Sequence, residues 1–137
     1  MGKIPKVVID TNVILSAFGW NGKPLKILTL LETNKIQNFI SSPIIEELER
    51  VIAYKKLNFS YRMQAGIIEF ISFYSKLVVP EVTFNLVKID PQDNKFVECA
   101  IKGNVDYIVS GDKHLLMLKK IKKIKVFSVD DFLKTIP

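Results

Sequence analysis

Cysteine and histidine are almost missing from this sequence, which holds one of each, Cys99 and His114. A lone cysteine excludes a disulfide framework and a zinc cluster built from thiolates, and it is typical of a protein from a reducing compartment. Glycine is missing from residues 10–18, where a dinucleotide-binding fold needs a glycine-rich turn after its first strand. These absences exclude disulfide-stapled, thiolate–zinc and dinucleotide-binding proteins.

Long apolar segments are missing as well. The longest candidate, residues 66–79, is interrupted by charged and hydroxyl side chains, and the first residues carry no long apolar region. We therefore expect no membrane span, no export signal and a cytoplasmic protein. The 137 residues, 48% of them hydrophobic, are enough for one core and too few for two, so we expect a single domain over residues 1–137.

Arginine is scarce: the chain has 2 Arg beside 18 Lys, against 14 acidic residues, for a formal net charge of +6. A basic surface of this kind attracts polyanions, of which nucleic acid is the commonest. The candidates for contact with an RNA backbone are Lys113, Lys119, Lys120, Lys122 and Lys123. Residues 119–125 also fit a solvated lysine loop with Ile121 and Ile124 turned inward.

The sequence alternates short β-branched segments with amphipathic ones. Strands are predicted at residues 7–9, 36–40, 77–79, 107–109 and, as an edge strand, 126–127; helices are predicted at residues 13–18, 25–32, 44–54, 61–74, 91–103 and after Ser128. Ser42 and Pro43 predict the start of the third helix, because a hydroxyl can cap it and proline suits its first turn. Repeated strand–helix units indicate an α/β fold with a mostly parallel sheet.

Acidic residues occupy particular places in this pattern. Asp10 follows the first strand directly, and Asp112 follows the fourth. Open α/β sheets bind ligands at the carboxyl ends of their strands, so we interpret Asp10 as the anchor of an active site. Taken alone, Asp112 reads better as the acid of a Gly-Asp turn.

Two predicted helices carry further acids. Glu47 flanks the apolar face of the third helix, whereas Glu46 lies nearly opposite that face and has Arg50 four residues on, so a surface ion pair explains it. Asp93 is aligned with the apolar stripe of the fifth helix, where it also fits a capping box with Asp90.

The four acids Asp10, Glu47, Asp93 and Asp112 could converge. Each ionised pair at about 4 Å would then cost roughly 1 to 4 kcal/mol, so the cluster would require a counter-charge. No arginine or histidine recurs beside these acids, and hard oxygen ligands suit Mg²⁺ or Mn²⁺. A metal-free set of structural caps is the alternative.

Four stretches together resemble the PIN-domain nucleases and, within that family, the toxin-like group of VapC-type ribonucleases. In chain order they are Val8-Ile-Asp-Thr-Asn-Val13, Ser42-Pro-Ile-Ile-Glu-Glu-Leu48, Asp90-Pro-Gln-Asp-Asn-Lys-Phe-Val-Glu-Cys-Ala100 and Ser110-Gly-Asp-Lys-His-Leu115. The resemblance covers nearly the whole chain, and four motifs in the right order and elements are far more specific than one.

This resemblance implies a three-layer PIN-like fold with a parallel sheet of about five strands flanked by helices. It implies that the catalytic, metal-binding acids are Asp10, Glu47, Asp93 and Asp112, holding Mg²⁺ or Mn²⁺. Asn12 and Ser110 would be supporting polar groups, and helical geometry favours Glu47 over Glu46. The resemblance also implies an endoribonuclease that leaves 5′-phosphate and 3′-hydroxyl ends on single-stranded RNA, commonly as a homodimer, with a small protein antitoxin as partner of a toxin.

Other interpretations of the same residues stay open. The chain could be a housekeeping PIN nuclease of RNA maturation or decay, or a non-catalytic RNA-binding or protein-interaction module on the same fold. Asp-Thr-Asn after an apolar strand also resembles the start of haloacid-dehalogenase-type phosphatases, but Asn12 cannot replace the second acid of that family.

Overall fold

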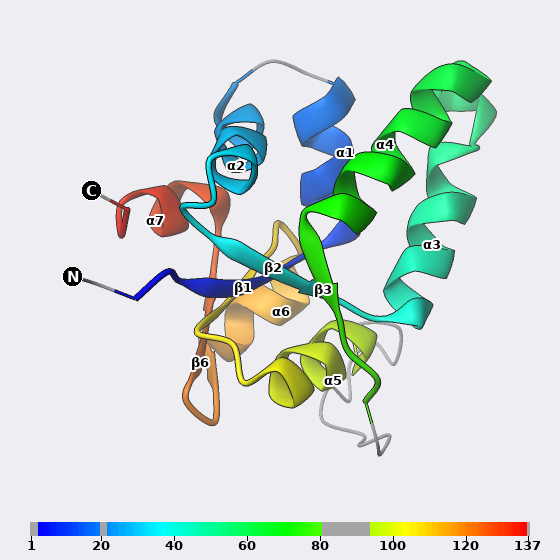
Figure 1. Cartoon of the computed structure of the whole chain (residues 1–137). Helices are drawn as coiled ribbons and strands as arrows, with labels where there is room; N and C mark the ends of the chain where they lie inside the picture. The colour runs from blue at the N-terminus through cyan, green and yellow to red at the C-terminus, as the bar shows by residue number, and fades with distance from the viewer. Residues whose placement is uncertain (1–2, 20–21, 81–93, 137) are drawn as a thin grey trace.

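Figure 1 shows the computed structural model of the chain, in which residues 3–19, 22–80 and 94–136 are described. The strands are β1 (Lys6–Ile9), β2 (Gln37–Ile40), β3 (Ser75–Leu77), β4 (Tyr107–Val109), β5 (Lys120–Ile121) and β6 (Ile124–Phe127). The helices are α1 (Thr11–Gly19), α2 (Lys23–Glu32), α3 (Ser42–Ile52), α4 (Tyr61–Phe73), α5 (Asn94–Gly103), α6 (Lys113–Leu118) and α7 (Val129–Leu133), with a 3-10 turn η1 (Lys55–Leu57).

The strands of the described residues form a six-stranded sheet in the order β3-β2-β1-β4-β6-β5. β1 pairs in parallel with β2 on one side and β4 on the other, β3 and β6 continue the parallel pairing, and β5 is antiparallel to β6. The chain thus builds outward from β1 to β3 and then returns to β4 on the opposite side. The prediction of a mostly parallel α/β sheet is confirmed, with six strands in place of about five.

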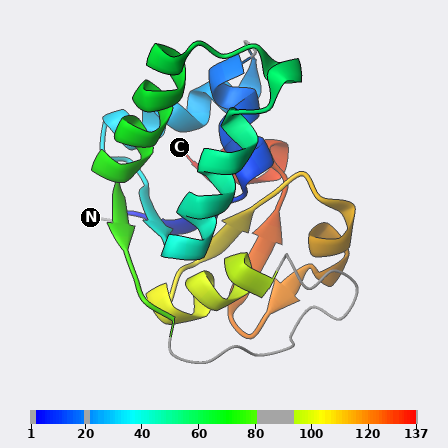
Figure 2. The same cartoon turned by 90° about the vertical axis from the view of Figure 1, so that its right-hand side faces the viewer.

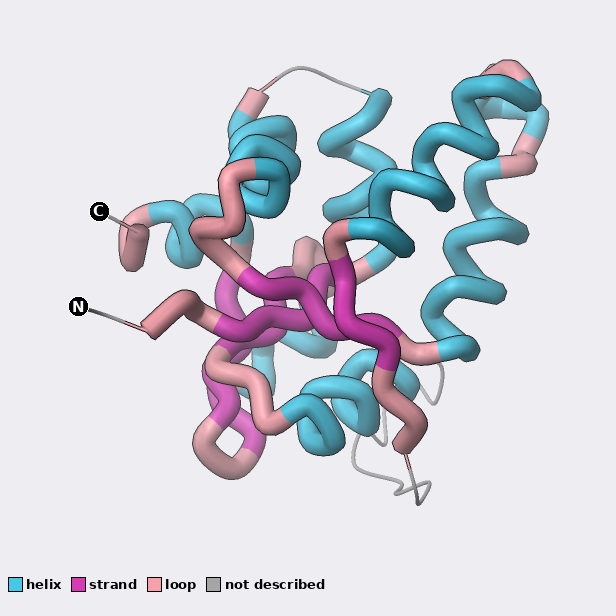
Figure 3. Tube along the Cα trace, in the orientation of Figure 1, coloured by secondary structure: helices cyan, strands magenta, loops and turns pink. Residues whose placement is uncertain are grey.

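The sheet lies between two layers of helices. In Figures 1 and 3, α1, α2, α3 and α4 lie on one side of the sheet and α5 on the other, and Figure 2 shows both layers in a view turned by 90°. Val7, Val8 and Ile108 are fully buried in β1 and β4, because helices cover both faces of these strands. α5 contacts β1, β2 and β4 and buries Val97 and Ala100.

The structure contains two elements that the sequence patterns do not predict, α6 and β5. α6 follows Asp112, whose carboxylate accepts hydrogen bonds from the amides of His114 and Leu115. Asp112 is therefore a helix N-cap and more than a turn residue. β5 pairs with β6 in a hairpin, so the prediction that residues 126–127 form an edge strand is wrong, because β5 occupies that edge.

Several predicted boundaries are shifted by about two residues. β3 begins at Ser75 rather than at residue 77, and the Ser75 hydroxyl accepts a hydrogen bond from the Asn38 side chain of β2 at 2.8 Å. The N-cap of α3 is Ser41 rather than Ser42. The helix start predicted at Pro91 lies outside the described residues. Among the helices of the described ranges, none has the length and apolar character needed to span a bilayer.

Candidate active site

Asp10 lies at the carboxyl end of β1, beside the end of β4. Its backbone amide donates to the carbonyl of Val109 at 2.9 Å, which ties the two strand ends together. Its carbonyl accepts from the amides of Val13 and Ile14 and so begins α1. Strand order reverses between β1 and β4, and in open α/β sheets this point of reversal forms the ligand crevice. The predicted anchor residue therefore occupies the position where such a fold binds its ligand.

Two hydrogen bonds hold the carboxylate of Asp10, a residue that is 4% exposed. The fully buried Ser110 donates its hydroxyl to Oδ2 at 2.6 Å, and the amide of Asn12 donates to Oδ1 at 3.2 Å. Ser110 also accepts from the amide of Asp112 at 2.9 Å, which links the loop after β4 to the carboxylate after β1. Ser110 is thus placed as the predicted supporting group, while the side chain of Asn12 is exposed.

The electrostatic surroundings of Asp10 oppose its ionisation. Burial raises the pKa of Asp10 above its ordinary value of 3.8. The hydrogen bonds from Ser110 and Asn12 lower that pKa in part, and the negative charges of Glu47 and Asp112 raise it further. The structure therefore brings three of the four predicted acids into electrostatic contact.

Glu47 projects from α3 toward the start of α1. Its Oε2 accepts the hydroxyl hydrogen of Thr11 at 2.6 Å, and its Oε1 pairs with Nζ of Lys95 from α5 at 2.7 Å. The side chains of Glu47 and Lys95 are 13% and 18% exposed, so this ion pair is largely shielded from water. Glu46, by contrast, is exposed.

Thr11 and Lys95 are two site residues that the sequence reasoning did not assign. Thr11 lies inside the first motif and Lys95 inside the third, but no pattern in the sequence distinguishes them from the other threonines and lysines. Lys95 also supplies a positive charge beside one of the predicted acids, which no arginine or histidine of the sequence was expected to do. It reaches Glu47 across 48 positions of sequence, a contact that only the packing of α5 near α3 creates.

Asp93 lies outside the described residues. Within residues 3–19, 22–80 and 94–136, no three side chains of aspartate, glutamate, histidine or cysteine are grouped closely enough to hold a metal ion. The donor type nevertheless fits one, because Asp10 and Asp112 offer carboxylate oxygens, the ligands that Mg²⁺ and Mn²⁺ prefer.

The lysines of the turn before β6 lie away from Asp10, whereas Lys113 directly follows Asp112. Lys122 and Lys123 form the turn before β6, at the amino end of that strand, whereas Asp10 lies at the carboxyl ends of its parallel neighbours. His114 is exposed in the first turn of α6. Cys99 is fully buried in α5, and burial raises the pKa of its thiol to about 12 against a small opposing effect of the Ser41 hydroxyl. Such a thiol stays protonated and unreactive at neutral pH.

Comparisons with known proteins agree with this architecture. The crystal structure of PAE2754 from Pyrobaculum aerophilum is similar in fold, with a TM-score of 0.63 and 12% identity over 97% of this chain and 89% of that one. The uncharacterized protein MJ1680 of Methanocaldococcus jannaschii is 37% identical over 126 residues, which cover 86% of this chain and 77% of that protein. Residues 6–114, which include Asp10, Glu47 and Asp112, match the family model described as PIN domain. This chain therefore belongs to the PIN-domain family.

Proposed function

We propose that this chain is a divalent-metal-dependent endoribonuclease that cleaves single-stranded RNA, and that it belongs to the toxin-like, VapC-type group. PIN domains are generally nucleases and typically use divalent metal ions, so the family supports the reaction class. The observation that carries the proposal is the buried carboxylate of Asp10 at the point of strand reversal, with Glu47 and Asp112 near enough to raise its pKa. A buried acid among acids is unfavourable without a cation.

Each residue of the candidate active site has a distinct role in this proposal. Asp10 and Asp112, together with Asp93, would hold Mg²⁺ or Mn²⁺, and Glu47 would be a further ligand or would accept a proton from water. The bound ion supplies a water of lowered pKa and stabilises charge on the leaving oxygen. Ser110 and the Asn12 amide hold the two oxygens of Asp10 in fixed directions.

Thr11 and Lys95 orient Glu47 from opposite sides, since each donates to a different carboxylate oxygen. Lys95 also compensates the Glu47 charge while the pair is shielded from water. With a formal net charge of +6, the chain attracts the phosphates of RNA over a longer range.

For the biological role we propose the toxin of a toxin–antitoxin pair, with a small protein antitoxin as its inhibitor and a homodimer as the active form. A housekeeping nuclease of RNA maturation or decay would use the same residues. A small antitoxin gene beside the gene for this chain supports the toxin, and its absence supports the housekeeping enzyme.

The Lys95–Glu47 ion pair favours a second candidate function, a non-catalytic RNA-binding or protein-interaction module. This pair already neutralises one of the four predicted acids, and the described residues hold no complete metal-binding group. In such a module the acids would act as caps and structural hydrogen-bond acceptors, as Asp112 does for α6.

The deciding experiment incubates the protein with defined RNA oligonucleotides and Mn²⁺, and then maps the ends of any products. We expect metal-dependent cuts that leave 5′-phosphates and that disappear in Asp10→Asn. Asp106→Asn is the matched control, because it removes the same charge from a carboxylate that accepts from the Lys6 amide at the opposite end of β1. RNA that binds the wild type but stays intact with Mn²⁺ would instead establish the module.

A further inference from the structure

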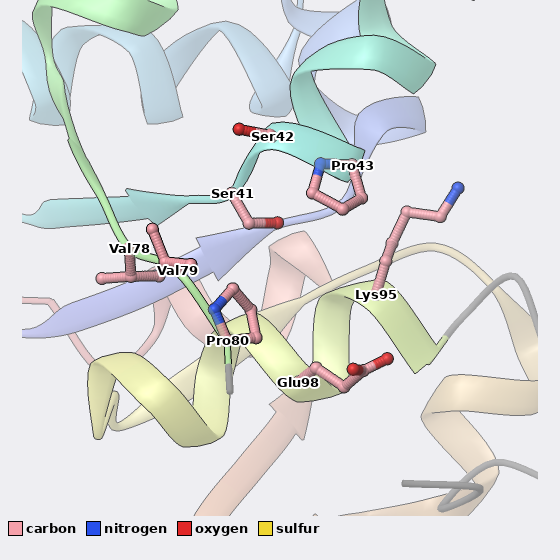
Figure 4. A pocket seen from close by; sticks show the side chains of 8 residues that line it. All are labelled: Ser41, Ser42, Pro43, Val78, Val79, Pro80, Lys95 and Glu98. Atoms are coloured by element: carbon pink, nitrogen blue, oxygen red, sulfur yellow. The ribbon is translucent and has the colours of Figure 1, made fainter. Parts of the chain in front are cut away.

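A pocket with a volume of about 390 Å³ opens where the chain leaves β2 and β3, beside α5 (Figure 4). Its apolar wall consists of Pro43 from the first turn of α3 and of Val78, Val79 and Pro80, which follow β3. The volume lies in the range of small-molecule sites, which are mostly apolar with a few placed polar groups. Rigid, partly exposed proline and valine side chains can pack against the face of an aromatic ring.

Four polar residues, Ser41, Ser42, Lys95 and Glu98, complete the pocket lining. Lys95 and Glu98 project from successive turns of α5, and Ser41 lies at the end of β2. Figure 4 shows the Ser41 hydroxyl pointing into the space that Pro43, Pro80 and Lys95 enclose. Ser41 is 1% exposed and, apart from the weak interaction with the Cys99 thiol, its oxygen has no hydrogen-bond partner among the described residues. An unsatisfied buried hydroxyl favours a ligand atom that can bond to it.

Lys95 connects this pocket to the candidate active site. Its stem lines the pocket, and its ammonium group pairs with Glu47, which is bonded in turn to Thr11 beside Asp10. A ligand in the pocket therefore lies next to the acids rather than on a separate face of the molecule. The ion pairs of the described residues, Lys95–Glu47 and Lys23–Asp130, leave Glu98 out, so its carboxylate is available to a ligand.

We propose that this pocket binds one nucleotide of the RNA substrate adjacent to the cut, and that Glu98 selects its base. The inference rests on the proposed ribonuclease function and names a specificity determinant for it. The base packs on the wall of Pro43, Val78, Val79 and Pro80, as unstacked bases of single-stranded RNA pack on apolar and aromatic surfaces. The phosphate of the same nucleotide lies near Lys95.

The chemistry of Glu98 decides which bases fit. An ionised carboxylate only accepts hydrogen bonds, so it favours a base edge that carries an amino group. Cytosine, adenine and guanine each offer one, whereas uracil presents carbonyl oxygens on both sides of a single N–H group. We therefore expect selection against uracil at one position next to the cut.

The test sequences the cut ends of an RNA pool with randomised positions, treated with the wild type and with Glu98→Gln. We expect uracil to be depleted on the order of tenfold at one position by the wild type. An amide both donates and accepts, so Glu98→Gln should restore uracil there. Glu69→Gln, which removes a charge from an exposed acid of α4, is the matched control and should keep the wild-type base profile.

A second measurement does not depend on cleavage. Amide chemical shifts of Val78, Val79 and residues 95–98 are followed by NMR during titration with cytidine monophosphate, uridine monophosphate and inorganic phosphate. We expect the cytidine nucleotide to bind more tightly than the uridine nucleotide, and Glu98→Gln to remove the difference. Val79→Trp should weaken both, because Val79 is 72% exposed and a large side chain there fills the pocket without disturbing the core.

The outcomes separate the inference from the proposed function. If the wild type cuts no RNA, the proposed ribonuclease function is wrong. The NMR titration then tests nucleotide binding in the pocket independently. A wild type that cuts RNA with the same base profile as Glu98→Gln overturns the pocket and leaves the ribonuclease standing. Inorganic phosphate that reproduces the shifts of cytidine monophosphate, with no difference between bases, also overturns base selection.

Discussion

Asp10 carries a charge that its surroundings partly oppose. The carboxylate is almost fully buried, and two other acids lie close to it, while the compensating hydrogen bonds come from one hydroxyl and one backbone amide. Lys95, the cation of this region, pairs with Glu47 and not with Asp10. The fold therefore leaves a partly uncompensated negative site at the end of β1, which is the electrostatic condition that favours binding of a cation.

The first prediction follows from the direction of the Asp10 pKa shift. A carboxyl whose pKa is raised by folding contributes its full stability below its ordinary value of 3.8 and loses that contribution as pH rises through the higher pKa of the folded state. In the absence of metal, the stability of Asp10→Asn relative to the wild type should therefore increase as the pH rises above 3.8 and through the higher pKa of the folded state. The reason is that asparagine has about the same shape as aspartate and carries no charge. Urea unfolding in EDTA at a series of pH values measures the difference.

The same two proteins test the metal. Mg²⁺ or Mn²⁺ should raise the melting temperature of the wild type, because an ion that binds only the folded state stabilises it. Asp10→Asn and Asp93→Asn should blunt that rise, and Asp106→Asn should keep it. Equal responses of wild type, Asp10→Asn and Asp93→Asn would remove the metal site, and a stability difference that is constant with pH would remove the pKa argument.

At this scale the sequence predicted the acids better than their partners. Asp10 and Ser110 could be anticipated because each follows a buried strand, and parallel strands end at the same edge. Lys95 could not, because a cation among many lysines has no distinguishing pattern until α5 packs beside α3. The hydroxyl of Thr11 was equally hidden, since a threonine after a strand is common and only the geometry directs it to Glu47.

Three helices begin with a serine at the N-cap, but these serines do not stabilise their helices equally. Ser60 and Ser128 accept hydrogen bonds from the amides of Met63 and Asp131 at 3.0 and 3.1 Å, as N-caps do. Ser41 occupies the N-cap position of α3 without such a bond, and its hydroxyl lies instead at the pocket beside α5. Its side chain therefore contributes little to the stability of α3.

The second prediction compares these three serines. Replacement of Ser60 or Ser128 by alanine should lower the free energy of unfolding by about 1 kcal/mol, because each removes the partner of a backbone amide. Replacement of Ser41 should cost about 0.5 kcal/mol or less, because no capping bond is lost. Chemical denaturation of the three variants decides the point. A loss for Ser41→Ala as large as for the other two would show that its hydroxyl caps α3 after all.

Elements with a clear apolar pattern were predictable, whereas α6 and β5 were not. β1, β4, α2 and α4 lie within two residues of their predicted bounds, because each combines an apolar pattern with a clear stop. α6 and β5 span six and two residues, too few for a period to appear. In the hairpin turn between β5 and β6, Lys122 has a φ of 54°. Lysine rarely adopts this left-handed conformation, so the sequence did not indicate a turn there.

At the scale of the whole molecule, the predicted acids and the lysines of the hairpin turn lie at opposite ends of the parallel strands. Acids gather at the carboxyl ends of β1 and β4, whereas Lys122 and Lys123 lie at the amino end of β6. An RNA strand that touches both must run along the sheet from one end to the other. The separation predicts that binding and chemistry respond to different substitutions.

The third prediction uses this separation. Replacing Lys119, Lys120, Lys122 and Lys123 by alanine should weaken RNA binding for every sequence and flatten its salt dependence, by a slope of about 0.7 for each phosphate that the protein no longer neutralises. The rate at saturating RNA should survive. Asp112→Asn should bind RNA at least as tightly as the wild type and cleave it slower by orders of magnitude. Single-turnover rates at saturating RNA compare the two, and wild-type cleavage by Asp112→Asn would reduce this acid to the cap of α6.

The fourth prediction concerns association through α4. Two of its apolar residues, Ile67 and Ile71, are buried in the core of their own chain, while Phe73 is 77% exposed and Tyr61 is 90% exposed. We expect these rings to pair with a second copy in a homodimer. Phe73→Glu should therefore give a monomer in light scattering at micromolar concentration, whereas Met117→Glu, at a residue that is 69% exposed on α6, should not. A wild-type monomer would end this expectation.

The hydrogen bond between Ser110 and Asp10 joins residues 100 positions apart, and β4 must pair with β1 before it can form. A nascent chain that ends before Tyr107 therefore has an open edge on β1 and an Asp10 carboxylate without its hydroxyl donor. While such a chain is still attached to a ribosome, it is surrounded by RNA but lacks the assembled acid cluster. The strand order therefore also sets the time of assembly, since the contact between Ser110 and Asp10 cannot form until Tyr107–Val109 and Ser110 have been translated.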